Sequence, residues 1–179
     1  GSLPSSDQVR GYKEFKTAEI IKEELEKLGI AYEDKIGLTG IKATEGKPGG
    51  YHIALVSDVD ALPGKGFDGQ IHSCGHSIQT AIALGTAKVL KELNLLDGTD
   101  VSVSFIFTPA EEFIDFEYRD RLIKEGKILY RSGKQNMIAL GYFDDIDCVL
   151  SAHANGDKDT LFDINSTLAG FSAKKITFK

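Results

Sequence analysis

Three apolar runs constrain the fold of this chain most, because each is typical of a buried strand and each stops at residues that can do chemistry. They cover 53–56, 101–107 and 148–152, and they are followed by acidic residues, a glutamate pair and a histidine respectively. Helical patterns lie between them, and this alternation predicts an α/β fold with a mixed, largely parallel sheet covered by helices. Ligands of open α/β sheets bind at the carboxyl ends of the strands, so one shared site is predicted there.

The helices are predicted from apolar residues at helical spacing. The first covers 7–28 and ends at Gly29, and the second covers 77–95. The buried side of the second is expected to carry Ile78, Ala81, Ile82, Gly85, Val89 and Leu93. The charged stretch 113–145 predicts two short helices with a turn near 132–133. Further short strands are expected at 31–35, 38–43, 161–164 and 174–178.

Composition excludes several classes of protein. A net charge of −6 argues against general nucleic-acid binding and against binding to an anionic membrane surface. No apolar run approaches the roughly 20 residues of a membrane span, and the start has no signal-peptide pattern. The two cysteines, one of them in a metal-like motif, point to a reducing compartment. A cytoplasmic protein without nucleic-acid or membrane partners is therefore expected.

Cys74 and His76 form the strongest metal-type pair in the chain. They follow a glycine-rich turn and precede the helix predicted at 77–95, which is where a catalytic loop would lie. A thiolate beside an imidazole suits zinc or a later transition metal better than magnesium or calcium. The other cysteine, Cys148, has apolar strand neighbours and is expected to be a core thiol.

The adjacent glutamates Glu111 and Glu112 can divide the work of a hydrolytic metal site. Such a site needs protein ligands, an open position for water, and a carboxylate that takes the proton of that water. One glutamate would bind the metal and its neighbour would act as general base. The ligands would be Cys74, His76, one of the two glutamates, and His153. Asp58 or Asp60 would orient a ligand histidine.

Each of these residues alone has a simpler interpretation. The glutamate pair is also typical of a solvated helix start, His153 of a packed core residue, and Asp58-x-Asp60 of a turn cap. The two aspartates would also serve a magnesium-dependent phosphate-transfer enzyme, but that hypothesis leaves Cys74 and the glutamates unexplained. The occurrence of all these groups at strand ends and a helix entry favours the shared metal site.

Four motifs in order also carry a family resemblance. They are SDVDALP at 57–63, HSCGH at 72–76, FTPAEE at 107–112, and the strand that ends at His153. The chain resembles the zinc amidohydrolases of the aminoacylase/carboxypeptidase family. Within it, the chain is most similar to the branch of N-acyl-amino-acid amidohydrolases, hippurate hydrolase, indole-acetyl-amino-acid hydrolases and aminobenzoyl-glutamate hydrolases.

This resemblance implies a role for each candidate residue. Glu111 would be the general base. Asp60, predicted above from the residues to orient a ligand histidine, is the second candidate catalytic residue. The implied metal ligands are Cys74, His76, Glu112 and His153. The cofactor would be one or two divalent ions, zinc in the first place, with manganese or cobalt as alternatives. The implied fold is a three-layer αβα zinc-exopeptidase domain interrupted by a smaller lid domain that dimerises.

The chain also departs from that family's pattern. Ser77-Ile78-Gln79 stands where the family continues with Asp-Gly-His, and 113–136 is an unusual charged insert. Residues 1–172 are expected to form the N-terminal portion of the catalytic domain, and 173–179 the start of a lid whose remainder is absent. The longer enzyme is expected to be a homodimer that hydrolyses a small acyl-amino acid or peptide, and the chain alone to be inactive or nearly so. The alternative is a non-catalytic relative that keeps the fold for binding or assembly.

Overall fold

The computed structural model describes residues 14–63, 70–71, 73–112 and 115–154. Its elements are α1 (Phe15–Leu28), β1 (Tyr32–Ile36), β2 (Gly40–Gly46), β3 (Tyr51–Asp58), β4 (Leu62–Pro63), β5 (Gln70–Ile71), α2 (His76–Glu92), β6 (Val101–Thr108), α3 (Phe116–Lys124), α4 (Gly133–Ala139) and β7 (Cys148–Ser151). The strands predicted at 161–164 and 174–178, and the domain boundary at 172, lie outside the described residues.

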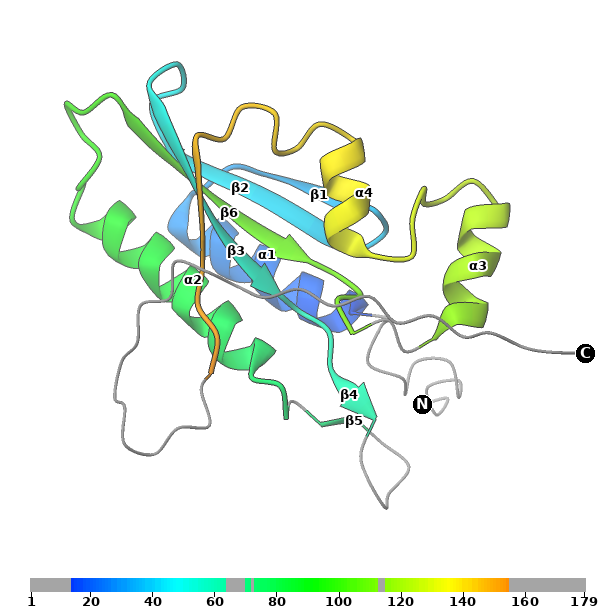
Figure 1. Cartoon of the computed structure of the whole chain (residues 1–179). Helices are drawn as coiled ribbons and strands as arrows, with labels where there is room; N and C mark the ends of the chain where they lie inside the picture. The colour runs from blue at the N-terminus through cyan, green and yellow to red at the C-terminus, as the bar shows by residue number, and fades with distance from the viewer. Residues whose placement is uncertain (1–13, 64–69, 72, 113–114, 155–179) are drawn as a thin grey trace, which may run out of the picture.

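One mixed sheet organises the described chain, with the strand order β1-β2-β6-β3-β7 (Figure 1). Strands β6, β3 and β7 are parallel, whereas β1 and β2 are antiparallel to their neighbours. The register pairs Asp58 with Thr108 and Val56 with Ser151, so the three parallel strands finish at the same edge of the sheet. Strands β4 and β5 form a separate two-stranded ribbon just beyond β3.

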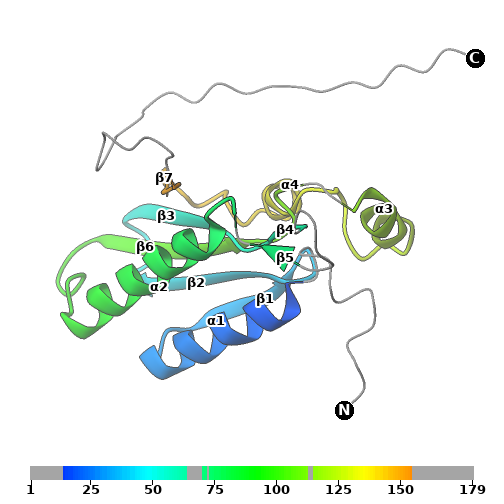
Figure 2. The ribbon, with the colours of Figure 1, turned by 90° about the horizontal axis from the view of Figure 1, so that it is seen from below.

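Helices cover both faces of the sheet, which confirms the predicted three-layer α/β fold. α1 and α2 lie on one face (Figure 2), where Ile21 and Leu25 pack with Phe105 of β6. The opposite face is covered in part by α4, whose Met137 packs against Ile106. β6 is almost wholly buried, as its apolar run predicted. α1 ends at Gly29 in the left-handed conformation, also as predicted. No helix among the described residues is long and apolar enough to cross a membrane.

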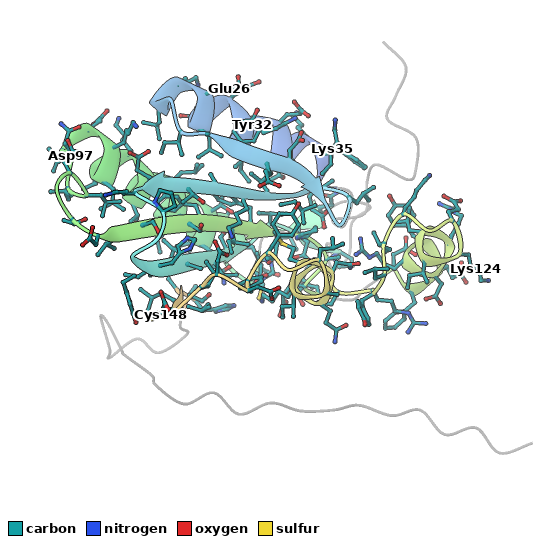
Figure 3. All side chains as sticks on the ribbon, turned by 90° about the horizontal axis from the view of Figure 1, so that it is seen from above. Glu26, Tyr32, Lys35, Asp97, Lys124 and Cys148 are labelled. Atoms are coloured by element: carbon teal, nitrogen blue, oxygen red, sulfur yellow. The ribbon has the colours of Figure 1, made fainter. Side chains whose placement is uncertain are left out.

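The buried side predicted for α2 is wrong. Ile78, Ile82, Val89 and Leu93 are between 42% and 64% exposed, and the residues that face the sheet are His76, Gln79, Ala83 and Ala87. The two alanines allow α2 to lie close to the sheet, while the larger apolar side chains point away from it. β7 is likewise more exposed than an apolar strand suggests, because it is the edge strand of the described sheet. Figure 3 shows its Cys148 at the opposite edge of the sheet from Tyr32.

Candidate metal centre

His76 is held in one orientation by Asp60. His76 is the first residue of α2, and its side chain is 2% exposed. Its Nδ1 lies 2.9 Å from the backbone carbonyl of Asp60 and 3.0 Å from the Asp60 carboxylate oxygen Oδ1. The Asp60 carbonyl accepts the Nδ1 proton, so the neutral form of the imidazole would present the lone pair of Nε2 to a metal. Asp60 itself follows β3 and is buried.

Cys74 and His153 bring two further ligand atoms to the same place. The Cys74 Sγ lies 3.4 Å from Nε2 of His153, and Nδ1 of His153 lies 2.9 Å from the carbonyl of Ala154. With that carbonyl accepting the Nδ1 proton, Nε2 of His153 accepts from the Cys74 thiol and would be the atom offered to a metal. The ligand atoms of Cys74, His76 and His153 all lie within 4.8 Å of one another. β7, paired with β3, brings His153 to this edge.

The buried carboxylate of Glu112 indicates that a cation fits beside Cys74, His76 and His153. Its Oε1 is buried without a hydrogen-bond partner and lies 3.9 Å from Nε2 of His76. The Glu112 backbone N–H donates to Asp60 Oδ2 at 2.9 Å, which fixes the loop after β6. A buried carboxylate oxygen is normally paired or metal-bound. A thiolate, two imidazole nitrogens and this carboxylate are together a donor set that fits zinc and related ions.

Glu111 lies beside this donor set without being buried in it. Its Oε2 is 4.0 Å from Nε2 of His76, and its side chain is 37% exposed. Partial burial raises the pKa of Glu111 above its usual range; the Lys134 ammonium opposes this shift, and the charges of Asp58 and other carboxylates add to it. A partly exposed carboxylate with a raised pKa is suited to general base catalysis.

The pKa values of Cys74 and His76 reflect burial and the neighbouring carboxylates. Burial raises the pKa of the Cys74 thiol to about 11, and the neighbouring Glu112 carboxylate adds to this effect. Burial alone would lower the pKa of His76, but the hydrogen bonds and charge of Asp60, with the charge of Asp58, raise it to about 9. Entry of a metal would therefore displace protons from both residues.

Every predicted site residue lies in this one region. The structure brings together Asp60, Cys74, His76, Glu111, Glu112 and His153, and their individual roles remain predictions. His72 lies outside the described residues. Two neighbours were not predicted as site residues: Lys134, whose Nζ donates to Asp58 at 2.8 Å, and Gln79, noted above only as a departure from the family pattern, whose Oε1 accepts the Asp58 backbone N–H at 2.8 Å.

The comparison with protein families identifies the chain's relatives. Residues 54–167 match the model of peptidase family M20/M25/M40. The chain belongs to this family. The M20/M25/M40 match includes the ends of β3, β6 and β7 and all six residues of the candidate centre. The predicted resemblance to metal-dependent amidohydrolases is thus confirmed.

Individual relatives agree with the family match. The chain is 38% identical over 112 residues to the IAA-amino acid hydrolase ILR1-like 5 of Arabidopsis thaliana, covering 57% of this chain and 25% of that protein. It is 32% identical over 155 residues to the N-acetyl-L-cysteine deacetylase of Bacillus subtilis, covering 81% and 33%. The structure of the Bacillus subtilis YXEP protein, a dinuclear metal binding peptidase of the M20 family, is similar with a TM-score of 0.64 and 28% identity, covering 83% of this chain and 39% of that chain. This M20 chain spans a quarter to a third of the length of these two curated relatives.

Proposed function

We propose that this chain is the ligand-bearing part of a metal-dependent amidohydrolase that cleaves the amide bond of N-acyl amino acids, aminoacyl conjugates or small peptides. The observation that carries the proposal is the unpartnered, buried Oε1 of Glu112, which lies 3.9 Å from Nε2 of His76. That histidine in turn has its ligand atom within 4.8 Å of those of Cys74 and His153. The names of the relatives, an amino acid conjugate hydrolase and a deacetylase of an acylated amino acid, support this class of substrate.

The proposed metal ligands are Cys74, His76, Glu112 and His153. Their thiolate and imidazole groups favour zinc, and manganese or cobalt would also be accepted by the same set. When bound, such an ion would supply a Lewis acid for the scissile carbonyl and for the attacking water.

The protein's own residues move the protons. Glu111, beside the ligand atoms, would remove a proton from the attacking water and return it to the nitrogen of the leaving amine. Asp60 would keep the proton of His76 on Nδ1, so that this histidine presents Nε2 to the metal. The strand-end loops fix these two side chains relative to each other, since the Glu112 backbone N–H donates to the Asp60 carboxylate.

For a longer protein that contains this chain, the proposal extends to its organisation. Residues 1–172 would belong to the catalytic domain and 173–179 would begin a lid domain; the family match, 54–167, falls inside the first part. The longer protein would form a homodimer through the lid and act in the cytoplasm. The 179-residue chain alone would turn over an acyl-amino acid slowly or not at all.

The test combines metal content with turnover. Zinc is measured by elemental analysis in the full chain and in its Cys74→Ser and His76→Ala variants, with Cys148→Ser as the control at the sheet edge. The unsubstituted chain and the control are expected to bind zinc, and the two ligand variants to lose it. In a longer protein with N-acetyl amino acids as substrate, Glu111→Gln is expected to lower turnover about 10²- to 10⁴-fold while metal is retained.

Two results would contradict this proposal in different ways. Equal zinc content in Cys74→Ser, His76→Ala and Cys148→Ser would reject the ligand set. The non-catalytic binding relative would be favoured if the longer protein bound metal fully but showed no turnover, and if Glu111→Gln changed no measured property.

A further inference from the structure

A second group of ligand-type atoms lies next to the first and shares a residue with it. Asp58, His76 and Glu111 each offer an atom within 4.8 Å of the others. Two adjacent groups of this kind would hold two divalent ions, and the similar Bacillus subtilis structure is that of a dinuclear metal binding peptidase. In this chain, however, His76 contributes to both groups while its Nδ1 is occupied by Asp60. Only Nε2 remains, and one lone pair binds one ion.

Both carboxylate oxygens of Asp58 already accept hydrogen bonds from protein groups. It is 4% exposed, the hydroxyl of Thr108 donates to its Oδ1, and Nζ of Lys134 donates to its Oδ2 at 2.8 Å. Its backbone N–H donates to Gln79, so the end of β3 is fixed as well. A divalent ion at this carboxylate would therefore compete with the Lys134 ammonium group.

Lys134 also reaches the second carboxylate of the group. Its Nζ lies 3.9 Å from Oε1 of Glu111, so one ammonium group faces both acids. The start of α4 fixes the backbone at Lys134, whose side chain is 39% exposed. The Ser132 hydroxyl accepts the Gln135 backbone N–H, and Gly133 lies so close to Pro109 that a Cβ would come within 1.9 Å of the Pro109 carbonyl oxygen. A resident positive charge in this place repels a second cation.

We propose that Lys134 is the resident cation of the Asp58–His76–Glu111 group, so that this group takes no second divalent ion beside the one proposed at Cys74, His76, Glu112 and His153. This inference rests on the proposed metal centre. Lys134 thereby neutralises the charge of Asp58. It also holds Glu111 beside the ion of the proposed metal centre. It is a positioning residue, because it acts through the two carboxylates that it contacts.

The experiment counts metal ions with and without the ammonium group. Metal-free full chain is titrated with Mn²⁺, and free Mn²⁺ is followed by electron paramagnetic resonance; bound zinc is counted separately by elemental analysis. The variants are Lys134→Met and Lys134→Gln, which remove the charge, and Lys134→Arg, which keeps it. Lys127→Met is the matched control, since Lys127 pairs only with Glu125 among the described residues and lies outside the centre. Thermal unfolding verifies that every variant is folded.

The unsubstituted chain, Lys134→Arg and Lys127→Met are expected to bind one ion. Lys134→Met and Lys134→Gln are expected to bind a second Mn²⁺ at least about tenfold more tightly than the unsubstituted chain, with the spectral broadening of two neighbouring spins. Two ions in the unsubstituted chain, or a second ion bound equally well with and without Lys134, would overturn the inference and leave the proposed centre intact. No bound metal in the unsubstituted chain would instead reject the proposed centre, and with it the basis of the inference.

Discussion

At the scale of single residues, Glu14 determines the shape of the loop that carries the glutamate pair. Its carboxylate is 5% exposed, accepts the Thr39 hydroxyl at 2.9 Å, and accepts the Ala110 backbone N–H at 3.0 Å. Ala110 has a φ of 51°, a left-handed conformation that residues other than glycine rarely adopt. Glu14 therefore stabilises a strained backbone one residue before Glu111, although 96 residues separate it from Ala110.

Glu14 should also make the stability of the fold depend on pH. Burial raises its pKa from 4.5 to about 7, although its hydrogen bonds oppose the shift. The folded chain therefore binds this proton more tightly than the unfolded chain does. The resulting stabilisation is complete below about pH 4.5 and is lost as the pH rises through about 7. Its full size is of the order of 3 kcal/mol.

Glu14→Gln is expected to remove this pH dependence while keeping both contacts, because the amide oxygen accepts from Ala110 and the amide nitrogen donates to Thr39. The free energy of unfolding, measured in urea at several pH values, should become flatter in the variant, which should exceed the original chain in stability near about pH 8. Glu19→Gln, at an exposed position of α1, is the control. A Glu14→Gln chain with the original pH profile would contradict the assignment.

The grouping of the six candidate residues could be predicted from the sequence because each follows a strand or lies at the start of a helix. Parallel strands that end at one edge bring such residues together without any knowledge of side-chain packing. Lys134 and Gln79 could not be found in this way. The contact between Lys134 and Asp58 spans 76 residues of sequence, and it depends on how closely α4 approaches the end of β6. No local spacing contains that information.

At the scale of elements, α2 shows what an apolar pattern predicts and what it does not. The pattern gave the helix to within a few residues, since a stripe of apolar side chains at helical spacing is the signature of a helix. It did not give the face that packs on the sheet. That face consists of small residues such as Ala83 and Ala87, and the larger Ile78, Ile82 and Val89 remain exposed. Periodicity identifies a stripe, but the neighbouring elements decide which stripe is covered.

Two glycines at α2 should respond oppositely to alanine. Gly75 has a φ of 96° between Cys74 and His76, and a Cβ there would lie 2.8 Å from the Cβ of Ala154, which follows His153. Gly75→Ala is expected to cost about 1–2 kcal/mol for the left-handed conformation alone. Because it also displaces His153, it should weaken zinc binding.

Gly85 is the matched position inside the same helix. It is exposed, and a Cβ there would meet no atom within 4 Å, so Gly85→Ala should stabilise the chain by about 0.5–1 kcal/mol and leave zinc binding unchanged. Unfolding in urea and a zinc titration measure both quantities. Equal effects of the two substitutions would contradict the special role given to Gly75.

At the scale of the whole molecule, one side of the fold has an apolar surface next to an edge strand. Ile78, Ile82 and Val89 of α2 are exposed, and Leu150 of β7 is 53% exposed. Leu150 pairs in register with Leu55, which packs in the α1/α2 core, so it lies on the α2 side of the sheet. Since the chain spans a quarter to a third of its two curated relatives, we expect the remainder of the catalytic domain to cover this surface in a longer protein.

This expectation can be tested by placing a charge on the surface. Ile82→Lys should change the free energy of unfolding of the 179-residue chain by less than about 0.5 kcal/mol, because Ile82 is already 42% exposed. In a longer protein of the relatives' length, the same substitution would bury an unpaired ammonium group and should cost about 2 kcal/mol or more. Ile20→Lys on α1, where Ile20 is 50% exposed, is the control and should have a small effect in both proteins. If Ile82→Lys had the same small effect in the longer protein, this surface would not be where the rest of the domain packs.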